Sequence, residues 1–337
     1  MTIPTTMKAA IVTAYGGPQV VEIQSRPTPI PRDDQVLVKT IATTVNSGDA
    51  RMRALDAPAG MKTLMRLAIG ITRPRQPIFG TEIAGTIVAI GPKVSRFSIG
   101  DHVIAFPDTG LKCHAQYVAV SERKSIVPKP ENLSFDEAAG LCFGGTAALH
   151  FLRKAGIKPG EHVLVIGASG AVGSAMVQLA GHFGATVTAV ASAANADLAR
   201  GLGANAFIDY AITDYTAVSS AYDVIADTVG ATDFRRCLNA LKPGGRYLGI
   251  AGGIGDMLAR PKNGKRPIAG MAAQRPEDVA FLAGLAAKGA YRVVVDQTFA
   301  FADITSAHAR VDSKHKRGSV VVRVDDWSAS SKSMSST

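Results

Sequence analysis

The sequence predicts an α/β fold in which a doubly wound parallel sheet is inserted into a β-rich domain. Over about the first 130 residues, short apolar runs alternate with turn residues, which is the pattern of many short strands. From residue 131 onward strands alternate with helices, as in βαβ units with a parallel sheet. We therefore expect a β-rich domain at 1–130, the parallel-sheet domain at 131–275, a return to the β-rich domain at 276–326 and a flexible tail at 327–337.

The first stretch contains five strand-like runs, each bounded by turn residues: MKAAIV, QVLVKTIATTV, EIAGTIVAIG, HVIAF and AQYVAV. Residues 58–76 differ, because MKTLMRLAI predicts a short helix that Pro74 and Pro77 close off. Ser134 and Glu137 have the spacing of a capping box, so a helix is expected to follow toward residue 153.

The second stretch repeats a strand–helix register. We expect strands at HVLVIG, TVTAVA, AFIDY, DVIADTV and GRYLGIA, with helices at 171–183, 196–201 and 232–240. A helix at about 277–287 and the strand-like RVVVDQTFAF follow. The later strand resembles the first stretch again, which is why the parallel-sheet domain is expected to be an insertion.

The composition limits the class of protein. With 337 residues, 47% of them hydrophobic and 19% charged, the chain can bury a sizeable core. Its three cysteines are far apart and form no CxxC pair, so neither a disulfide framework nor a four-cysteine zinc lobe is expected. No apolar run reaches the ~20 residues that span a bilayer. We expect a cytoplasmic protein with no membrane partner.

The net charge of +10 could indicate nucleic acid, an acidic membrane surface or an anionic ligand. The basic residues are scattered and aromatic residues are not interleaved with them. This distribution predicts no nucleic-acid partner as a main role. It favours a solvated surface with some bias toward a phosphorylated cofactor.

A glycine-rich turn follows the strand His162–Ile166 and opens a helix at Ser174–Gly181. The turn matches A-x-G-x-x-G, with a further glycine at Gly167. Glycine at the third position lets the backbone approach a pyrophosphate, and the helix N-terminus offers free N–H groups to the phosphates. Such turns also occur as plain loops, but the flanking strand and helix favour a dinucleotide site made by Ala168, Ser169, Gly170, Ala171, Val172 and Gly173.

The end of the second strand of this domain indicates which dinucleotide binds. An NAD site normally places Asp or Glu there, whereas this chain has only uncharged residues from Val190 to Asn195. Ser192 and Asn195 can hydrogen-bond a 2′-phosphate, although no Arg or Lys stands beside them. We therefore favour NADPH over NADH. The alternative is a site of dual specificity in which Ser192 only caps a helix.

Together the motifs resemble the medium-chain dehydrogenase/reductase superfamily, and most closely its zinc-free quinone oxidoreductase-like branch. They cover about residues 7–324 and read MKAAIVTAYGGPQVVEI, VNSGD, FGTEIAGTI, FSIGDHV, GASGAVGSAMVQLA, GLGANAFIDY, DVIADTVG, LKPGGRYLGI and HKRGSVVVRV. The resemblance implies a GroES-like domain that holds a small-molecule substrate and a Rossmann domain that holds the cofactor. By analogy it also implies a homodimer.

Zinc alcohol dehydrogenases of this superfamily place a Cys where this chain has Asn46, a His where it has Thr81, and a third ligand at Cys142. Of these three positions, only Cys142 keeps a residue that can bind zinc. Because catalytic zinc usually needs three protein ligands, we expect no zinc. Glu82 matches an acidic position that shapes the site more often than it binds metal.

The resemblance carries further residues into the cofactor site. Thr146 matches a threonine that approaches the nicotinamide, and Tyr210 a residue near the adenosine phosphate. The other matching positions are two strand ends, Asp227-Thr228-Val229 and Ile250-Ala251-Gly252, and a basic pair close to the cofactor, Lys316 and Arg317. Ordinary packing or a solvated charge is the alternative for each.

Without a zinc ion, hydride addition to a quinone or an α,β-unsaturated carbonyl is easier than alcohol oxidation, because the acceptor delocalises the arriving charge. Asn46, Asp49 and Thr81 are candidates for the polar lining, and Tyr117 or water for the proton. We predict an NADPH-dependent quinone or enone reductase. The alternatives are a trans-acting enoyl reductase of lipid or polyketide assembly, a zinc-type alcohol dehydrogenase, and a weakly catalytic nucleotide-binding or sensor protein.

Overall fold

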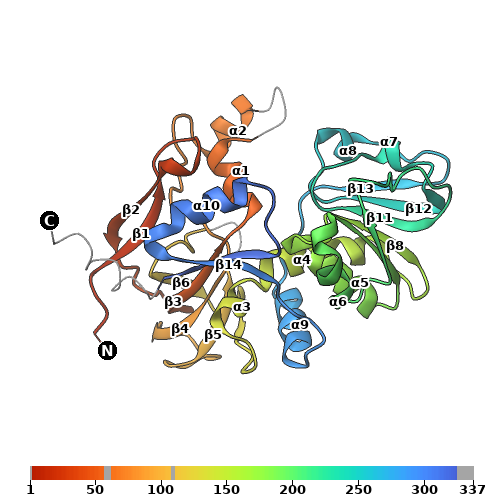
Figure 1. The fold of residues 1–337 in the computed structure, drawn as a ribbon. Coiled ribbons are helices and arrows are strands. Elements are labelled where there is room, and N and C mark those ends of the chain that lie inside the picture. Colours follow the sequence, from red (N-terminus) through yellow and green to blue (C-terminus); the bar gives the residue numbers. More distant parts are fainter. Residues whose placement is uncertain (1, 57–61, 108–110, 325–337) are drawn as a thin grey trace. The chain divides into compact units, whose positions relative to one another are not determined.

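A computed structural model describes residues 2–56, 62–107 and 111–324. The chain divides into two compact units. Unit 1 comprises Met1–Phe143, Arg275–Ala287 and Val293–Thr337, and unit 2 comprises Gly144–Gln274 and Lys288–Arg292 (Figure 1). The expected tail at 327–337 lies outside the described residues. Within the described part, no helix has the length and apolar character needed to cross a bilayer.

Unit 1 is built on a seven-stranded sheet with the order β14-β15-β3-β4-β5-β7, in which β6 also pairs with β3. All pairs are antiparallel except β14 with β15. The strands are β3 (Gln35–Val45), β4 (Ile83–Ile90), β5 (His102–Phe106), β6 (Tyr117–Ser121), β7 (Ser125–Pro128), β14 (Val295–Ala300) and β15 (Ser319–Arg323). A separate hairpin pairs β1 (Thr6–Val12) with β2 (Val21–Pro27).

The helices of unit 1 are α1 (Ser47–Ala54), α2 (Lys62–Ile69), α3 (Phe135–Ala139), α9 (Pro276–Ala287) and α10 (Ile304–Asp312), with short 3-10 turns η1 (Pro18–Val20) and η4 (Phe301–Asp303). The core lies in separate apolar clusters. One contains Val36 and Val38 of β3 with Ile83 and Ile87 of β4. Another joins the end of β3 to α10 through Val45, Phe301 and Ile304.

Unit 2 is a doubly wound parallel sheet with the order β10-β9-β8-β11-β12-β13. Its strands are β8 (His162–Ile166), β9 (Thr186–Ala191), β10 (Ala206–Asp209), β11 (Tyr222–Asp227), β12 (Leu241–Gly249) and β13 (Arg266–Ala269). The strand order reverses between β8 and β11, which is where such sheets bind ligands. The predicted fold class is confirmed.

The helices of unit 2 are α4 (Cys142–Ala155), whose first two residues still belong to unit 1, α5 (Ala171–His182), α6 (Ala196–Gly201), α7 (Phe234–Cys237) and α8 (Ile254–Leu258), with the 3-10 turn η3 (Ala193–Asn195). The predicted helix at 232–240 is shorter in the structure, because the chain must turn before β12. Helix α2 ends before Gly70, because a φ of +136° does not fit a helix. It therefore ends earlier than expected, since Pro74 was predicted to close it.

Unit 2 begins at Gly144, whereas the strand–helix alternation placed the start of the parallel-sheet domain at residue 131. Residues 131–143 instead belong to unit 1. Helix α3 packs on β3, β4 and β15, and the carboxylate of Glu82 accepts hydrogen bonds from the backbone N–H groups of Cys142 and Phe143. These long-range contacts override the local pattern.

Candidate functional site

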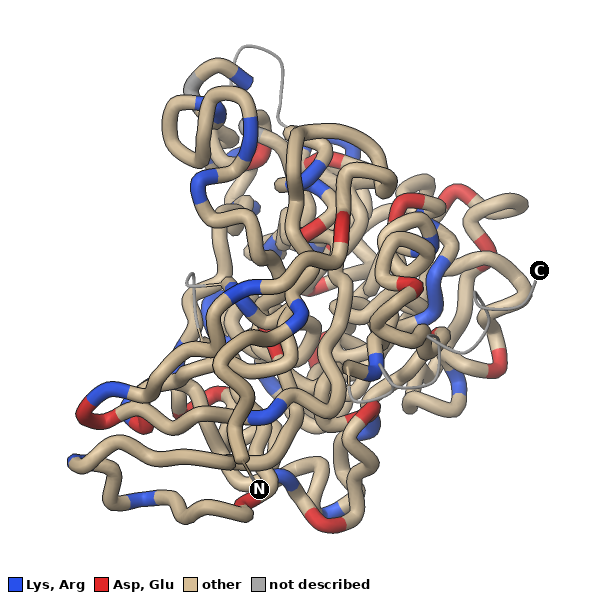
Figure 2. The backbone as a smooth tube through the Cα atoms, turned by 90° about the vertical axis from the view of Figure 1, so that its left-hand side faces the viewer, with Lys and Arg blue, Asp and Glu red and all other residues tan. Residues whose placement is uncertain are grey.

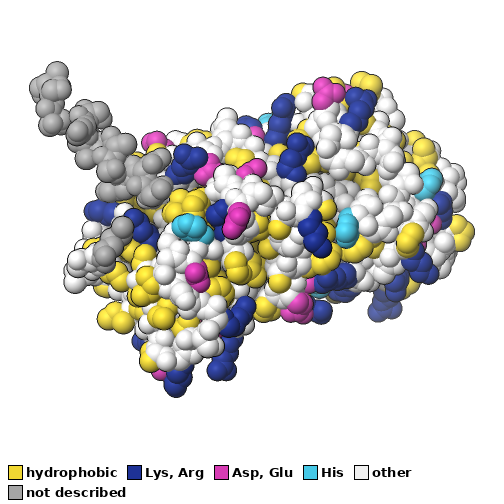
Figure 3. All heavy atoms as spheres, turned by 90° about the horizontal axis from the view of Figure 1, so that it is seen from below, with side chains coloured by type: hydrophobic (Ala, Val, Ile, Leu, Met, Phe, Trp, Pro, Cys, Tyr) yellow, Lys and Arg dark blue, Asp and Glu magenta, His cyan; other side chains and the backbone are white. Residues whose placement is uncertain are grey.

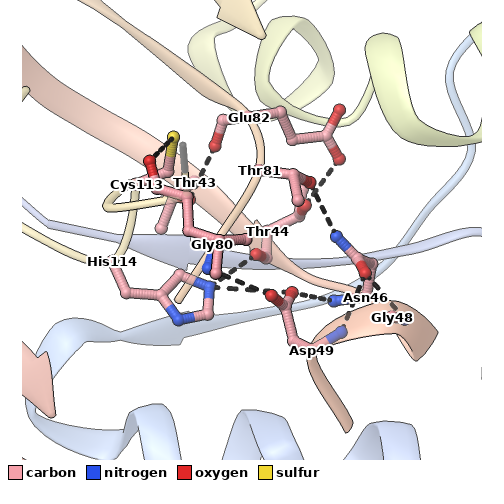
Figure 4. Close-up of polar contacts among 11 residues, drawn as sticks. Thr43, Thr44, Asn46, Gly48, Asp49, Gly80, Thr81, Glu82, Cys113 and His114 are labelled. Carbon is pink, nitrogen blue, oxygen red and sulfur yellow. Dashed lines mark hydrogen bonds and ion pairs between the residues drawn. The ribbon is translucent and has the colours of Figure 1, made fainter. Parts of the chain in front are cut away.

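The first group of predicted site residues gathers where β3 ends, α1 begins and β4 is about to start (Figure 4). Asn46 caps α1, because its Oδ1 accepts from the N–H groups of Gly48 at 2.8 Å and Asp49 at 3.2 Å. These two donors fix the orientation of the amide. Its Nδ2 must then donate, and it donates to the hydroxyl oxygen of Thr81 at 2.9 Å.

Asp49 lies beneath this pair and is fully buried. Its Oδ2 accepts from the Asn46 N–H at 2.9 Å, and its Oδ1 accepts from the Gly80 N–H at 3.0 Å. Burial raises the pKa of Asp49, and the nearby His114 ring, 3.9 Å away, opposes that rise. The carboxylate thus ties α1 to the loop that carries Thr81, so its role in the site is to hold Asn46 and Thr81 in place.

Glu82 is a second buried carboxylate and follows Thr81 directly. It accepts from the Thr44 hydroxyl at 2.5 Å and from the N–H groups of Cys142 at 3.0 Å and Phe143 at 2.7 Å. Burial raises its pKa to about 7, although all three donors favour the ionised form. A carboxylate at a helix N-terminus also complements the helix dipole. Glu82 therefore anchors the start of α4, a role that its sequence position did not reveal.

The residues at the zinc positions do not suit the metal. Asn46 and Thr81 hydrogen-bond each other, and neither an amide nor a neutral hydroxyl is a good zinc ligand. Burial raises the pKa of the Cys142 thiol well above its usual value, which disfavours the thiolate that binds metal. Among the described residues, no three or more His, Cys, Asp and Glu side chains lie together as a metal site would need.

Tyr117 lies elsewhere in unit 1. It is half-buried on β6 and packs against a cluster that contains Met7, Ala9, Ile11 and Ala115. Burial raises the pKa of its hydroxyl. The structure brings together Asn46, Asp49 and Thr81 of the predicted catalytic residues, and it gives Tyr117 no hydrogen bond to them among the described contacts.

The glycine turn of unit 2 is built for close backbone approach. Gly167 has φ +79°, and a Cβ on it would lie 2.5 Å from the Val229 side chain. A Cβ on Gly173 would lie 2.0 Å from the Gly167 carbonyl oxygen, so only glycine fits there. Gly170 differs, because a Cβ would meet nothing nearer than 3.5 Å. Helix α5 begins at Ala171 with no side-chain cap on its N-terminus, which leaves N–H groups available to an anion.

Two strand ends border this turn. Asp227 ends β11 fully buried, and its carboxylate accepts from the N–H groups of Val229 at 3.0 Å, Gly230 at 2.8 Å and Thr232 at 2.8 Å. It shapes the loop. Next to it the Thr228 hydroxyl donates to the Ile166 carbonyl at 2.8 Å.

The second strand end is that of β12, where the Ile250 N–H donates to the Asp227 carbonyl at 3.0 Å and Ala251 and Gly252 follow. A Cβ on Gly252 would lie 2.4 Å from the Asp256 carboxylate, so the backbone at Gly252 also lies too close to its neighbour for a larger residue. The carboxyl ends of β8, β11 and β12 therefore meet around the glycine turn.

Ser192 and Asn195 lie together after β9. The Asn195 amide donates to the Ser192 hydroxyl at 2.9 Å, while its buried Oδ1 has no partner among the described residues. Tyr210 is 55% exposed, and its N–H donates to the Ala191 carbonyl at 3.4 Å. The end of β9 is thus a polar, uncharged surface.

Thr146 lies buried in the second turn of α4. Gly144 of the same helix lets α4 pack against the turn, since a Cβ on it would lie 2.4 Å from the Ala171 carbonyl oxygen. Lys316 and Arg317 belong to unit 1 and precede β15. Burial lowers the pKa of Lys316 to about 8, and its Nζ donates to the Gly318 carbonyl at 2.6 Å. The Arg317 N–H donates to Asp296 at 2.9 Å.

Comparison with known proteins agrees with this architecture. The alcohol dehydrogenase GroES-like domain family matches residues 32–158, and a zinc-binding dehydrogenase family matches residues 202–322. An NADPH-dependent alkenal/one oxidoreductase of Arabidopsis thaliana is 31% identical, over 95% of this chain and 80% of its own length. A quinone oxidoreductase of Sus scrofa is 32% identical over 76% of each chain.

A 2-methylene-furan-3-one reductase of Solanum lycopersicum is 34% identical over 75% of this chain, and the match spans 64% of that enzyme's length. The solved quinone oxidoreductase of Coxiella burnetii superposes with a TM-score of 0.79 at 26% identity, covering 95% of this chain and 99% of the other. The chain belongs to the medium-chain dehydrogenase/reductase superfamily, in its quinone oxidoreductase-like branch.

Two glycines of the turn separate cofactor binding from folding. In Gly170→Ala the added methyl group has room in the protein but projects where a pyrophosphate would lie. We expect unchanged thermal stability and a Kd for NADPH raised by about tenfold or more. Gly173→Ala forces the turn apart and should cost about 2 kcal/mol or more of stability. Calorimetric titration and thermal unfolding measure the two effects. Equal NADPH affinity of Gly170→Ala and the parent protein would place the cofactor elsewhere.

The buried carboxyl of Glu82 makes stability depend on pH. Its pKa of about 7 in the folded protein exceeds the value near 4.5 expected when unfolded, so the folded state binds more protons between these values. Stability should therefore fall as pH rises from about 5 to about 8. Glu82→Gln keeps an acceptor for Cys142 and Phe143 and removes the titration. Its unfolding midpoint should change less across this range, whereas parallel curves for both proteins would contradict the assignment.

Proposed function

We propose that the protein transfers a hydride from NADPH to a quinone or an α,β-unsaturated carbonyl, without a catalytic zinc. The observation that carries the proposal is the hydrogen bond from Asn46 to the Thr81 hydroxyl oxygen at the positions where zinc enzymes of the superfamily hold metal ligands. The names of the relatives, which include alkenal/one and quinone oxidoreductases, support the same reaction.

The direction of that hydrogen bond assigns Thr81 a task. Because Asn46 donates to the Thr81 oxygen, the Thr81 hydroxyl hydrogen is free to donate to another oxygen, and no described residue accepts it. When bound, the cofactor supplies the hydride. As the hydride reaches the acceptor carbon, the double-bond electrons move onto the carbonyl oxygen, and the Thr81 O–H stabilises the negative charge that develops there. Water or Tyr117 then supplies the proton that completes the reduction.

The cofactor lies, in this proposal, on the glycine turn from Ala168 to Gly173, with Thr146 and Ile250 to Gly252 toward the nicotinamide. Asp227 to Val229 line the strand end, and Tyr210, Lys316 and Arg317 are candidates for the phosphate end. Ser192 and Asn195 support NADPH over NADH, because no carboxylate at the end of β9 would repel a 2′-phosphate. Unit 1 would hold the substrate and unit 2 the cofactor. A homodimer and a cytoplasmic location remain expectations of the family resemblance and the sequence.

A substrate panel tests the reaction. Purified protein is mixed with NADPH or NADH and with quinones, enones, enoyl thioesters of phosphopantetheine and simple ketones. We expect NADPH oxidation with quinones or enones, and no loss of rate when a chelator is added. Turnover of ketones only, abolished by the chelator, would instead identify a zinc-type alcohol dehydrogenase. Activity confined to the thioesters would identify an enoyl reductase, and tight NADPH binding without turnover would identify a sensor.

The Thr81 hydroxyl has a matched pair of variants. Thr81→Val keeps the shape of the side chain but removes the donor, and should lower kcat on the order of 100-fold with little change in the Kd for NADPH. Thr81→Ser retains the hydroxyl and the acceptor for Asn46, and should keep most of the rate. Equal losses in both variants would show that Thr81 acts through packing.

A further inference from the structure

Helix α2 presents a large apolar side chain away from the packed side of unit 1. Met65 and Ile69 are half-buried, whereas Leu67 between them is 56% exposed. Two residues turn a helix by about 200°, so Leu67 lies on the side opposite the packed face. Ile71, in the turn that follows, is 64% exposed. Packing within the unit therefore explains why Met65 and Ile69 are apolar, but it does not explain the apolar side chains of Leu67 and Ile71.

The same segment is basic throughout. Between Asp56 and Glu82 the sequence contains no Asp or Glu and has four basic residues, Lys62, Arg66, Arg73 and Arg75. All four are exposed. In Figure 2 Lys and Arg positions gather on the coil at the top of the molecule, where Figure 1 places α2. On the face drawn in Figure 3, by contrast, Lys and Arg are interspersed with Asp and Glu.

Backbone contacts fold the basic residues onto the end of the helix. The Gly70 N–H donates to the Arg66 carbonyl at 2.8 Å, and the Arg75 N–H donates to the Ile69 carbonyl at 2.7 Å. The Arg75 guanidinium also donates to the Ala68 carbonyl at 3.1 Å. Tyr15 of the neighbouring loop donates its hydroxyl to the Gly70 carbonyl at 2.7 Å. The cations and the exposed apolar side chains therefore occupy one small region.

We propose that this α2 surface, formed by Lys62, Arg66, Leu67, Ile71, Arg73 and Arg75, binds the surface of an anionic lipid membrane. A helix with basic residues beside exposed apolar ones is suited to the interface, where the cations meet lipid phosphates and the apolar groups enter the acyl boundary. The sequence led us to expect no membrane partner, because no segment can span a bilayer. Binding at the surface needs no spanning segment.

Flotation of the full chain with vesicles tests the proposal. Vesicles of phosphatidylcholine alone are compared with vesicles of equal parts phosphatidylcholine and phosphatidylglycerol, at low and at physiological salt. We expect binding to the anionic vesicles only, weakened by salt. Arg66→Glu with Arg73→Glu should lower the affinity about tenfold or more. Leu67→Ser with Ile71→Ser should weaken binding at both salt concentrations, because it removes the apolar part.

Two control variants change the same properties elsewhere in unit 1. Lys93→Glu with Arg123→Glu makes the same change in net charge at two exposed residues that pair with Asp33 and Asp34. Ile30→Ser with Ile99→Ser removes two other exposed apolar side chains. Both controls should bind vesicles like the parent protein. All variants should reduce a short-chain, water-soluble quinone at the parent rate, if the proposed reaction holds; vesicle binding is measured independently of that rate.

Other outcomes would overturn the proposal. Equal loss of binding in Lys93→Glu/Arg123→Glu would show a non-specific effect of net charge. Retention of the Leu67→Ser/Ile71→Ser variant on vesicles, together with a raised KM for the soluble quinone, would assign α2 to the substrate site. A smaller oligomer for that variant in ultracentrifugation would assign α2 to an interface with a second copy of the chain. Binding to double-stranded DNA as tight as to anionic vesicles would indicate a general polyanion surface.

Discussion

The carboxylate of Glu82 is the constraint on which the candidate site depends. It is buried, and it would be costly there without the three donors that Thr44, Cys142 and Phe143 supply. Those donors come from β3 and from the first residues of α4, which are far apart in sequence. The same helix then carries Gly144 against the glycine turn and Thr146 two residues further on. One buried acceptor therefore joins β3, beside Thr81, to the first residues of α4.

Helix α1 adds two more buried charged side chains to the same unit. Its first turn carries Asn46 as the cap and Asp49 as the support, and its last turn carries Arg53, which is fully buried. The Arg53 guanidinium donates to both carboxylate oxygens of Asp312 on α10, at 2.7 and 2.6 Å. The side chain of Asp312 is 36% exposed, so only the guanidinium is buried, and removing its carboxylate partner would be costly. We infer that the pair fixes where α1 lies on α10, and thereby where Asn46 lies.

Local signals explain what the sequence predicted well. The fold class and the glycine turn follow from apolar periodicity and from glycines that serve backbone contacts close in sequence, such as Gly173 against Gly167. The roles of Glu82 and Asp227 could not be predicted in the same way, because their carboxylates serve backbone N–H groups whose positions only the folded loops define. The exposure of Leu67 is a third example. Its helix was predicted from its pattern, but which side faces solvent depends on how the helix packs on the rest of unit 1.

A single hydroxyl suffices for the proposed chemistry only because the acceptor is conjugated. A simple ketone concentrates the full charge of the arriving hydride on one oxygen, and a metal supplies several kcal/mol of stabilisation at that point. A quinone or enone spreads the charge before the protein acts. One oriented donor then contributes about 3–4 kcal/mol, judged by the loss when such donors are removed. In the proposed reaction, Thr81 is that donor, and the Asn46 amide, held by Gly48 and Asp49, orients it.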